Sequence, residues 1–119
     1  MKILVVDDQV NILTLVQLVL EDEGYDVHTV SSGIEAITRT ETQVYDLILL
    51  DLMMPKMTGY DTLSILRKES RTRHVPIVAF TAKILRGDES DMLKEGFDGY
   101  LEKPFRPEEL THIIKKHLT

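Results

Sequence analysis

The residues of this sequence that are best suited to chemistry follow short apolar runs. They are Asp7, Asp8, Asp51, Thr81 and Lys103. Asp51 stands out because it comes directly after Leu-Ile-Leu-Leu at residues 47–50, and an unpaired buried carboxylate costs several kcal/mol. Carboxylates within a few ångströms also repel one another, so a cation is needed to keep all of them ionised. Mg²⁺ meets that need, because it prefers carboxylate and phosphate oxygens and requires no His or Cys ligand.

These residue types predict the transfer of a phosphoryl group to a carboxylate. Asp forms covalent intermediates as a nucleophile. Lys103 would keep the aspartates ionised and neutralise an oxygen of the incoming group, and the Thr81 hydroxyl would donate a hydrogen bond. Structural alternatives remain open: Asp51 and Asp8 as helix caps or turn residues, Lys103-Pro104 as a plain loop, and Thr81 as an ordinary strand-end residue.

A regular alternation of apolar runs and helical spacing must position these residues. We predict strands at residues 2–6, 25–30, 46–50, 76–80 and 99–101, and helices at 11–23, 34–41, 60–69, 87–94 and about 107–117. The central runs are apolar throughout, which is typical of parallel strands covered on both faces. The predicted fold class is therefore α/β, a doubly wound parallel five-stranded sheet of flavodoxin-like order 2-1-3-4-5. In such a sheet the five polar residues lie at one edge, and the three aspartates meet between strands one and three.

Composition limits the other possibilities. A chain of 119 residues with 43% hydrophobic content forms one ordinary domain. It has no Cys, which excludes disulfides and thiolate chemistry, and its net charge of -6 argues against a surface that binds nucleic acid. No apolar run approaches the roughly 20 residues of a membrane span, so we expect a soluble, cytoplasmic protein without membrane contact.

Four motifs occur together and in order along the chain. They are VVDD at residues 5–8, LILLDLMMP at 47–55 followed by Gly59, FTA at 80–82 and YLEKPF at 100–105. Each motif alone is moderately specific, but their joint occurrence resembles the receiver domain of two-component response regulators over the whole chain. The resemblance implies that Asp51 is the phosphoacceptor, which takes a phosphoryl group from a phosphohistidine.

The resemblance also implies a role for the remaining site residues. Asp8 would bind Mg²⁺ directly, Asp7 mostly through water, and Met53 through its backbone carbonyl. Thr81 and Tyr100 match the switch pair of the family, in which phosphorylation draws the hydroxyl toward the phosphoryl group and the aromatic ring turns inward. The family often has the Lys-Pro bond that follows the last strand in the cis form. For Tyr100, a half-buried strand aromatic without a switch role remains an alternative.

The resemblance implies partners as well. We expect a sensor histidine kinase or a histidine phosphotransfer protein as donor and a downstream target protein contacted through the fourth helix, the fifth strand and the fifth helix. We expect no nucleic acid, and a monomer or a phosphorylation-linked dimer. Residues 1–119 would form one receiver domain without an output domain, which is not an enzyme beyond assisting its own phosphorylation and slow dephosphorylation. The alternatives are a receiver excised from a hybrid kinase or larger regulator, and a phosphorylation-independent binding module.

Other functions fit the residues less well. A haloacid-dehalogenase-type phosphatase needs a nucleophile and an acid separated by one residue after the first strand, whereas Asp7 and Asp8 are adjacent. Two aspartates in a flavodoxin's first loop would repel the phosphate that this loop must hold. The glycine patterns of nucleotide-binding proteins do not occur. The four histidines show no paired ligand spacing, and we expect them at the surface.

Further expectations concern packing, contact with the phosphodonor and kinetics. Ile12, Leu15, Val16, Val19 and Leu20 form the expected core face of the first helix, and Leu13 and Leu18 widen its apolar stripe. We expect Leu18 to contact a helical phosphodonor or else to be partly buried. Met53, Met54 and Met57 are expected to pack under their loop. Met53 and Lys83 flank the path of hydrolytic water, which predicts a long-lived aspartyl phosphate.

Overall fold

The computed structural model describes residues 1–82 and 88–118, and five parallel strands form its centre. The strands are β1 (Lys2–Val6), β2 (Asp26–Val30), β3 (Leu47–Asp51), β4 (Ile77–Thr81) and β5 (Gly99–Glu102). Their order in the sheet is β2-β1-β3-β4-β5. This order confirms the predicted doubly wound α/β fold. It also places the carboxyl end of β1 beside that of β3.

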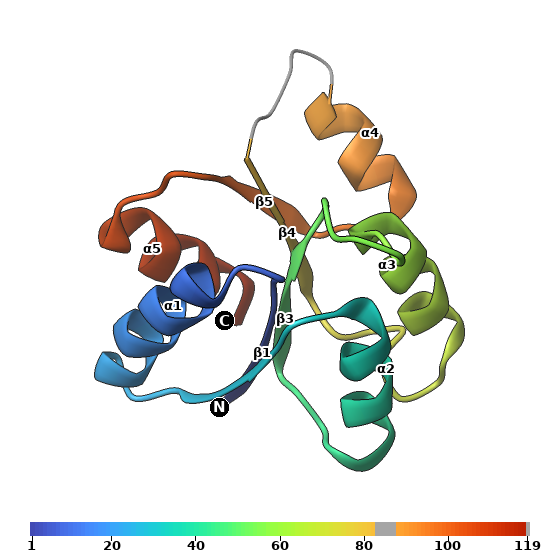
Figure 1. The fold of residues 1–119 in the computed structure, drawn as a ribbon, viewed down its shortest axis with the longest axis horizontal. Coiled ribbons are helices and arrows are strands. Elements are labelled where there is room, and N and C mark those ends of the chain that lie inside the picture. The colour runs from blue at the N-terminus through green and yellow to red at the C-terminus, as the bar shows by residue number, and fades with distance from the viewer. Residues whose placement is uncertain (83–87, 119) are drawn as a thin grey trace.

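Helices cover both faces of the sheet (Figure 1). On one face lie α1 (Val10–Asp22) and α5 (Pro107–Leu118), and on the other lie α2 (Gly33–Thr42), α3 (Gly59–Lys68) and α4 (Asp88–Glu95). No helix in the described part of the chain is long and apolar enough to cross a lipid bilayer. The predicted helix boundaries are correct to within about two residues where they can be compared. Residue 87, the predicted start of the fourth helix, and Lys83 lie outside the described residues.

The two faces explain why the central strands are apolar throughout. Alternate residues of β3 enter different cores: Ile48 and Leu50 pack toward α2 and α3, whereas Leu47 and Leu49 pack toward α1 and α5. All four are fully buried. A strand that contributes to both cores has no solvent-facing position, so an ionised residue within it must find partners inside the protein.

The ends of two central strands differ from the prediction. Strands three and four were expected to end at residues 50 and 80, but β3 includes Asp51 and β4 includes Thr81. The reason is that pairing continues to the edge, where Asp51 is the register partner of Phe80. The pleat of the sheet therefore fixes the directions of the Asp51 and Thr81 side chains.

The core face of α1 also differs in part from the prediction. Leu13, Val16 and Leu20 are buried in the core, whereas Leu15 is 43% exposed and Leu18 is 64% exposed. Leu13 lies three residues before Val16 and seven before Leu20, so these three share one side of the helix. The helix α1 is rotated on the sheet so that this side faces the core and Leu15 faces outward. The assignment of Leu15 to the core was therefore wrong.

Two of the four histidines are not fully exposed, contrary to the prediction. His74 and His112 are exposed as expected, but His117 is half-buried on α5, and so is His28 on β2. The Nδ1 atom of His28 lies 2.8 Å from the hydroxyl of the buried Tyr45, and the two rings meet edge to face. His28 therefore has a packing role at the edge of the sheet, which hydrophobic periodicity alone does not reveal.

Candidate functional site

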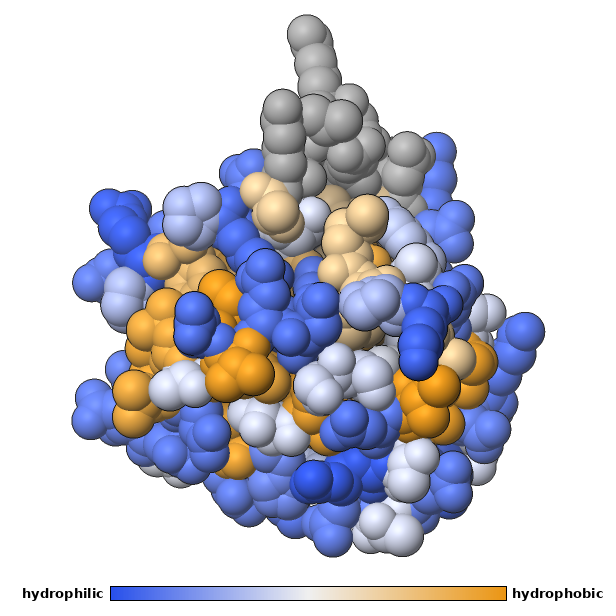
Figure 2. Space-filling view, in the orientation of Figure 1, coloured by the Kyte–Doolittle hydropathy of each residue, from blue (hydrophilic) through white to orange (hydrophobic). Residues whose placement is uncertain are grey.

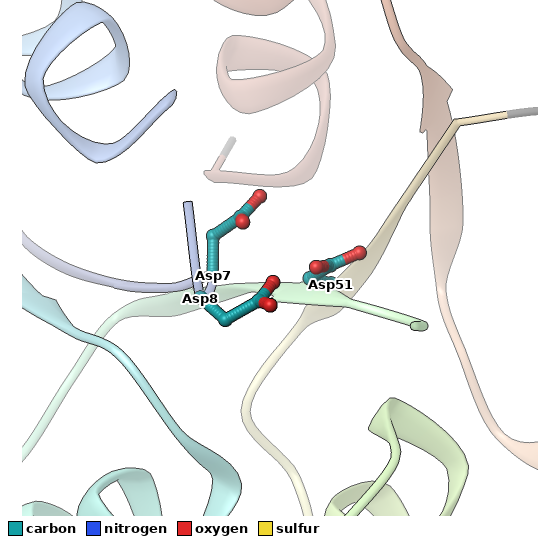
Figure 3. Close-up of side chains that lie close together, drawn as sticks. All are labelled: Asp7, Asp8 and Asp51. Atoms are coloured by element: carbon teal, nitrogen blue, oxygen red, sulfur yellow. The ribbon is translucent and has the colours of Figure 1, made fainter. Parts of the chain in front are cut away.

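Three aspartates gather at the carboxyl ends of β1 and β3 (Figure 3). Asp7 directly follows β1, whose last residue, Val6, is the register partner of Leu50 at the end of β3. Asp7, Asp8 and Asp51 each offer a carboxylate oxygen, and these oxygens all lie within 4.8 Å of one another. Asp7 and Asp51 are buried, and Asp8 is exposed. The structure thus brings together the three carboxylates that the sequence predicted to meet.

Backbone hydrogen bonds hold the two buried aspartates in place. The Asp7 amide donates to the carbonyl oxygen of Val30, and Asp7 Oδ1 accepts a hydrogen bond of 2.9 Å from the Gln9 amide. Asp51 Oδ1 accepts a longer bond of 3.3 Å from the Met53 amide. These backbone donors fix the side chains and offset part of the cost of burial.

Lys103 is the cation of the site. Its ammonium lies 2.6 Å from Asp7 Oδ2 and 3.5 Å from Asp51 Oδ1, and the side chain is only 12% exposed. The Lys103 amide donates to the carbonyl oxygen of Thr81, which attaches the residue to the end of β4, and the Lys103–Pro104 peptide bond is cis as expected. One lysine faces two buried aspartates, so the negative charge of these side chains exceeds the positive charge beside them.

Burial and the surrounding charges together alter the pKa of Asp51. Burial, followed by the negative charge of Asp7, raises the pKa of Asp51 from its ordinary value of 3.8 to about 6. Lys103 and the Met53 amide act in the opposite direction without cancelling the increase. At neutral pH the carboxylate is therefore ionised, which is the form that can act as a nucleophile, at a cost to the stability of the folded protein.

Thr81 and Tyr100 share one face of the sheet. Thr81 is buried at the end of β4, and Tyr100 on β5 is half-buried against the core on the side of α2, α3 and α4. Tyr100 is the register partner of Ala79, which lies two residues before Thr81, so the pleat points all three side chains toward the same face. The placement is compatible with the predicted switch pair, whose movement stays a prediction.

The loop after β3 approaches the Asp51 backbone closely. Gly59 begins α3, and its amide donates to the Leu52 carbonyl oxygen. A Cβ atom at residue 59 would lie 2.3 Å from the Asp51 carbonyl oxygen and 2.7 Å from Leu52 Cα. Real Cβ atoms do not approach backbone so closely, so only glycine fits without a shift of Asp51. The sequence marked Gly59 as part of a motif, but the steric reason is visible only in the structure.

The methionines after Asp51 divide between core and surface. Met54 is buried in the core, as expected. Met53 is 72% exposed, so the prediction that it packs under the loop was wrong. The cause is local: the Met53 amide donates to Asp51 Oδ1, which keeps the Met53 backbone at the site while its side chain extends into solvent.

The donor set fits a magnesium ion. The ligand atoms are carboxylate oxygens that converge at one point, two of them in buried side chains, with Met53 backbone beside them. Mg²⁺ typically takes one or two carboxylates and keeps several waters, for which the exposed Asp8 side leaves access. A divalent cation would also neutralise the charge that raises the pKa of Asp51.

A family model for the response regulator receiver domain matches residues 3–115. The chain belongs to this family. The receiver domain is 45% identical over 114 residues to the alkaline phosphatase synthesis transcriptional regulatory protein PhoP of Bacillus subtilis, a match that covers 96% of this chain. Among solved structures, chemotaxis protein CheY4 of Vibrio cholerae superposes with a TM-score of 0.93 at 33% identity, covering 98% of both chains. The predicted resemblance is therefore confirmed.

A second structural relative bears on the metal. The receiver domain of sensor histidine kinase PA1611 from Pseudomonas aeruginosa superposes with a TM-score of 0.90 at 38% identity, covering 98% of this chain and 96% of that one. That structure holds a magnesium ion coordinated in its active-site cleft. Receiver domains typically bind Mg²⁺, and the acidic cluster of this receiver domain is suited to the same ion.

The relatives also limit what can be said of the whole protein. The match covers 47% of the length of PhoP, so the chain spans about half the length of the curated relatives it matches. PhoP is named a transcriptional regulatory protein, and the expected absence of a nucleic-acid partner is therefore not confirmed. The expectation of a single receiver domain without an output domain likewise stays a prediction.

Proposed function

We propose that this receiver domain is a phosphorylation-activated switch in which Asp51 accepts a phosphoryl group from a phosphohistidine. The observation that carries the proposal is the convergence of Asp7, Asp8 and Lys103 on Asp51, whose pKa is raised to about 6 by burial and by Asp7. The donor would be a sensor histidine kinase or a histidine phosphotransfer protein. Lys103, together with a cation held by the aspartates, would offset the negative charge of the phosphoryl oxygens.

In the proposed reaction the Asp51 carboxylate attacks the phosphorus atom. The P–N bond of the phosphohistidine breaks, its electron pair returns to the imidazole, and a P–O bond forms to Asp51. We assign the attack to Oδ2, since Oδ1 accepts from the Met53 amide and faces Lys103. A bound magnesium ion would supply charge neutralisation for the carboxylates and the phosphoryl oxygens.

The remaining residues act on the product. Lys103, already 3.5 Å from Asp51 Oδ1, is close enough to donate to a phosphoryl oxygen after a small movement from Asp7. The Thr81 hydroxyl would donate to a second oxygen, and Tyr100 would turn inward as the Thr81 side chain moves. The surface formed by α4, β5 and α5 would carry the change to a downstream target protein.

Docking of the donor would use α1. Figure 2 shows apolar surface on the α1 side of the molecule. On α1 itself, Val10 is 69% exposed and Leu18 is 64% exposed. Both residues lie on the helix that begins three residues after Asp7. An exposed apolar stripe beside the acceptor suits a helical phosphodonor.

The proposal is tested by intact mass after incubation with acetyl phosphate and Mg²⁺. The expected result is one phosphoryl adduct that disappears when a chelator is added and does not form in the variant Asp51→Asn. Circular dichroism of both proteins shows that they are folded. A folded natural protein without an adduct would favour the alternative, a binding module that works without phosphorylation.

A further inference from the structure

An aromatic ring lies directly beside the cation of the site. The Lys103 ammonium lies 4.7 Å from the centroid of the Phe80 ring. Phe80 is fully buried, and the Lys103 side chain is 12% exposed. A lysine ammonium within about 6 Å of a ring face is attracted to the negative face of the ring, more strongly when water is excluded. The contact therefore adds an attraction to Lys103 that the carboxylates do not provide.

The sheet fixes this ring next to the nucleophile. Phe80 is the register partner of Asp51 on the neighbouring strand. Phe80 packs in the core on the α1 and α5 face of the sheet, which also contains Leu49. Because Asp51 comes two residues after Leu49 on β3, its side chain points to the same face. The ring of Phe105, tilted by 53° at a centroid distance of 5.2 Å, packs against Phe80. Phe80 is thus held at the boundary between an apolar core and the charged site.

We propose that Phe80 is a positioning residue that keeps the Lys103 ammonium within reach of the phosphoryl group. The inference rests on the proposed function. The Lys103 ammonium is held by Asp7 at 2.6 Å and lies farther from Asp51, at 3.5 Å. A cation held by the aspartates would neutralise the charge of Asp7 and so weaken the contact between Asp7 and Lys103. The ring, which carries no charge, attracts the ammonium with or without the cation.

An uncharged aromatic ring can hold the Lys103 ammonium without repelling the phosphoryl group. A third carboxylate beside Lys103 would also hold the ammonium, but it would repel the phosphoryl group. An aliphatic side chain would fill the same space in the core without attracting a cation. Only an aromatic residue at position 80 combines packing against Phe105 with attraction to Lys103.

The test replaces Phe80 with phenylalanines that carry one, two or three ring fluorines, which weaken the negative ring face in steps with little change in shape. The rate of phosphorylation from acetyl phosphate at saturating Mg²⁺ is expected to fall with each added fluorine. Over the whole series the rate should fall by roughly fivefold to thirtyfold, because losing about 1–2 kcal/mol of cation–π attraction changes a rate by that factor. The same substitutions at Phe97 are the matched control. Phe97 is also buried and meets Tyr60 edge to face, in the core of the opposite face.

A second measurement does not depend on phosphorylation. In the metal-free protein the ε-methylene proton signals of Lys103 are expected to be shifted upfield by the ring of Phe80, and to lose this shift in Phe80→Leu. Equal rates throughout the fluorine series, or an equal fall in the Phe97 series, would overturn the positioning role. If the natural protein accepts no phosphoryl group while its Lys103 signals are shifted, the proposed function fails and the positioning role fails with it, although the ring contact stands. Unshifted signals in a protein that is phosphorylated overturn the inference alone.

Discussion

Replacing Asp51 with asparagine should stabilise the protein in the absence of metal. The Asp51 carboxylate is buried, and burial together with Asp7 raises its pKa from 3.8 to about 6. At about 1.36 kcal/mol per pKa unit, this difference corresponds to about 3 kcal/mol by which ionisation of Asp51 destabilises the folded state. An amide of the same shape carries no such cost. We therefore expect the free energy of unfolding of Asp51→Asn to exceed that of the natural protein by about 2–3 kcal/mol at pH 7.5.

The direction of the pH dependence follows from the raised pKa. Below pH 3.8 Asp51 is protonated in both the folded and the unfolded chain, so it does not lower the free energy of unfolding. As pH rises from 3.8 through about 6, the unfolded chain loses the proton first, and the free energy of unfolding falls by up to about 3 kcal/mol. The advantage of Asp51→Asn should therefore be full above about pH 7 and should shrink toward zero near pH 4.

The assay is urea denaturation followed by circular dichroism between pH 4.5 and 8, with a chelator present. Asp8→Asn is the matched control, because Asp8 belongs to the same cluster but is exposed, and its gain should stay under about 1 kcal/mol. Added Mg²⁺ should narrow the difference between the natural protein and Asp51→Asn by binding the natural protein more tightly. A natural protein at least as stable as Asp51→Asn at pH 7.5 without metal would refute the reasoning.

Three more substitutions test separate parts of the site. Gly59→Ala should lower the free energy of unfolding by about 1–3 kcal/mol in urea denaturation, because its Cβ atom would collide with the Asp51 carbonyl oxygen. An unchanged midpoint of urea denaturation would contradict the close packing at residue 59. Leu18→Glu should slow phosphoryl transfer from the cognate donor at least tenfold and leave the rate with acetyl phosphate unchanged, whereas equal slowing of both would exclude the docking role. Met53→Asn should accelerate decay of the aspartyl phosphate several-fold, because an amide can orient a water molecule and a thioether cannot. The decay is measured as loss of the phosphoryl mass adduct over time. An unchanged decay rate would show that Met53 does not explain a long lifetime.

The fold and the acidic cluster could be predicted because the pattern determines them. Apolar runs that alternate with helical spacing allow few arrangements other than a doubly wound parallel sheet, and its strand order brings the ends of β1 and β3 together. Asp7, Asp8 and Asp51 follow those strands in the sequence, so their meeting was a consequence of topology.

The features that the sequence did not predict depend on contacts between distant residues. The burial of Leu13 in place of Leu15 depends on how α1 rotates on the sheet. The ring of Phe80 reaches Lys103 only because β4 and β5 are neighbours, and nothing in the local sequence distinguishes this phenylalanine from an ordinary core residue. The exposure of Met53 similarly follows from a hydrogen bond of its backbone to Asp51.

The most direct test of the central claim is to identify the phosphorylated residue. Borohydride reduces an aspartyl phosphate to homoserine, which tandem mass spectrometry can assign to one position after digestion of the protein treated with acetyl phosphate and Mg²⁺. The account predicts homoserine at position 51 and unmodified aspartates at positions 7 and 8. Homoserine at either of those two positions, or none anywhere in a folded protein, would contradict it.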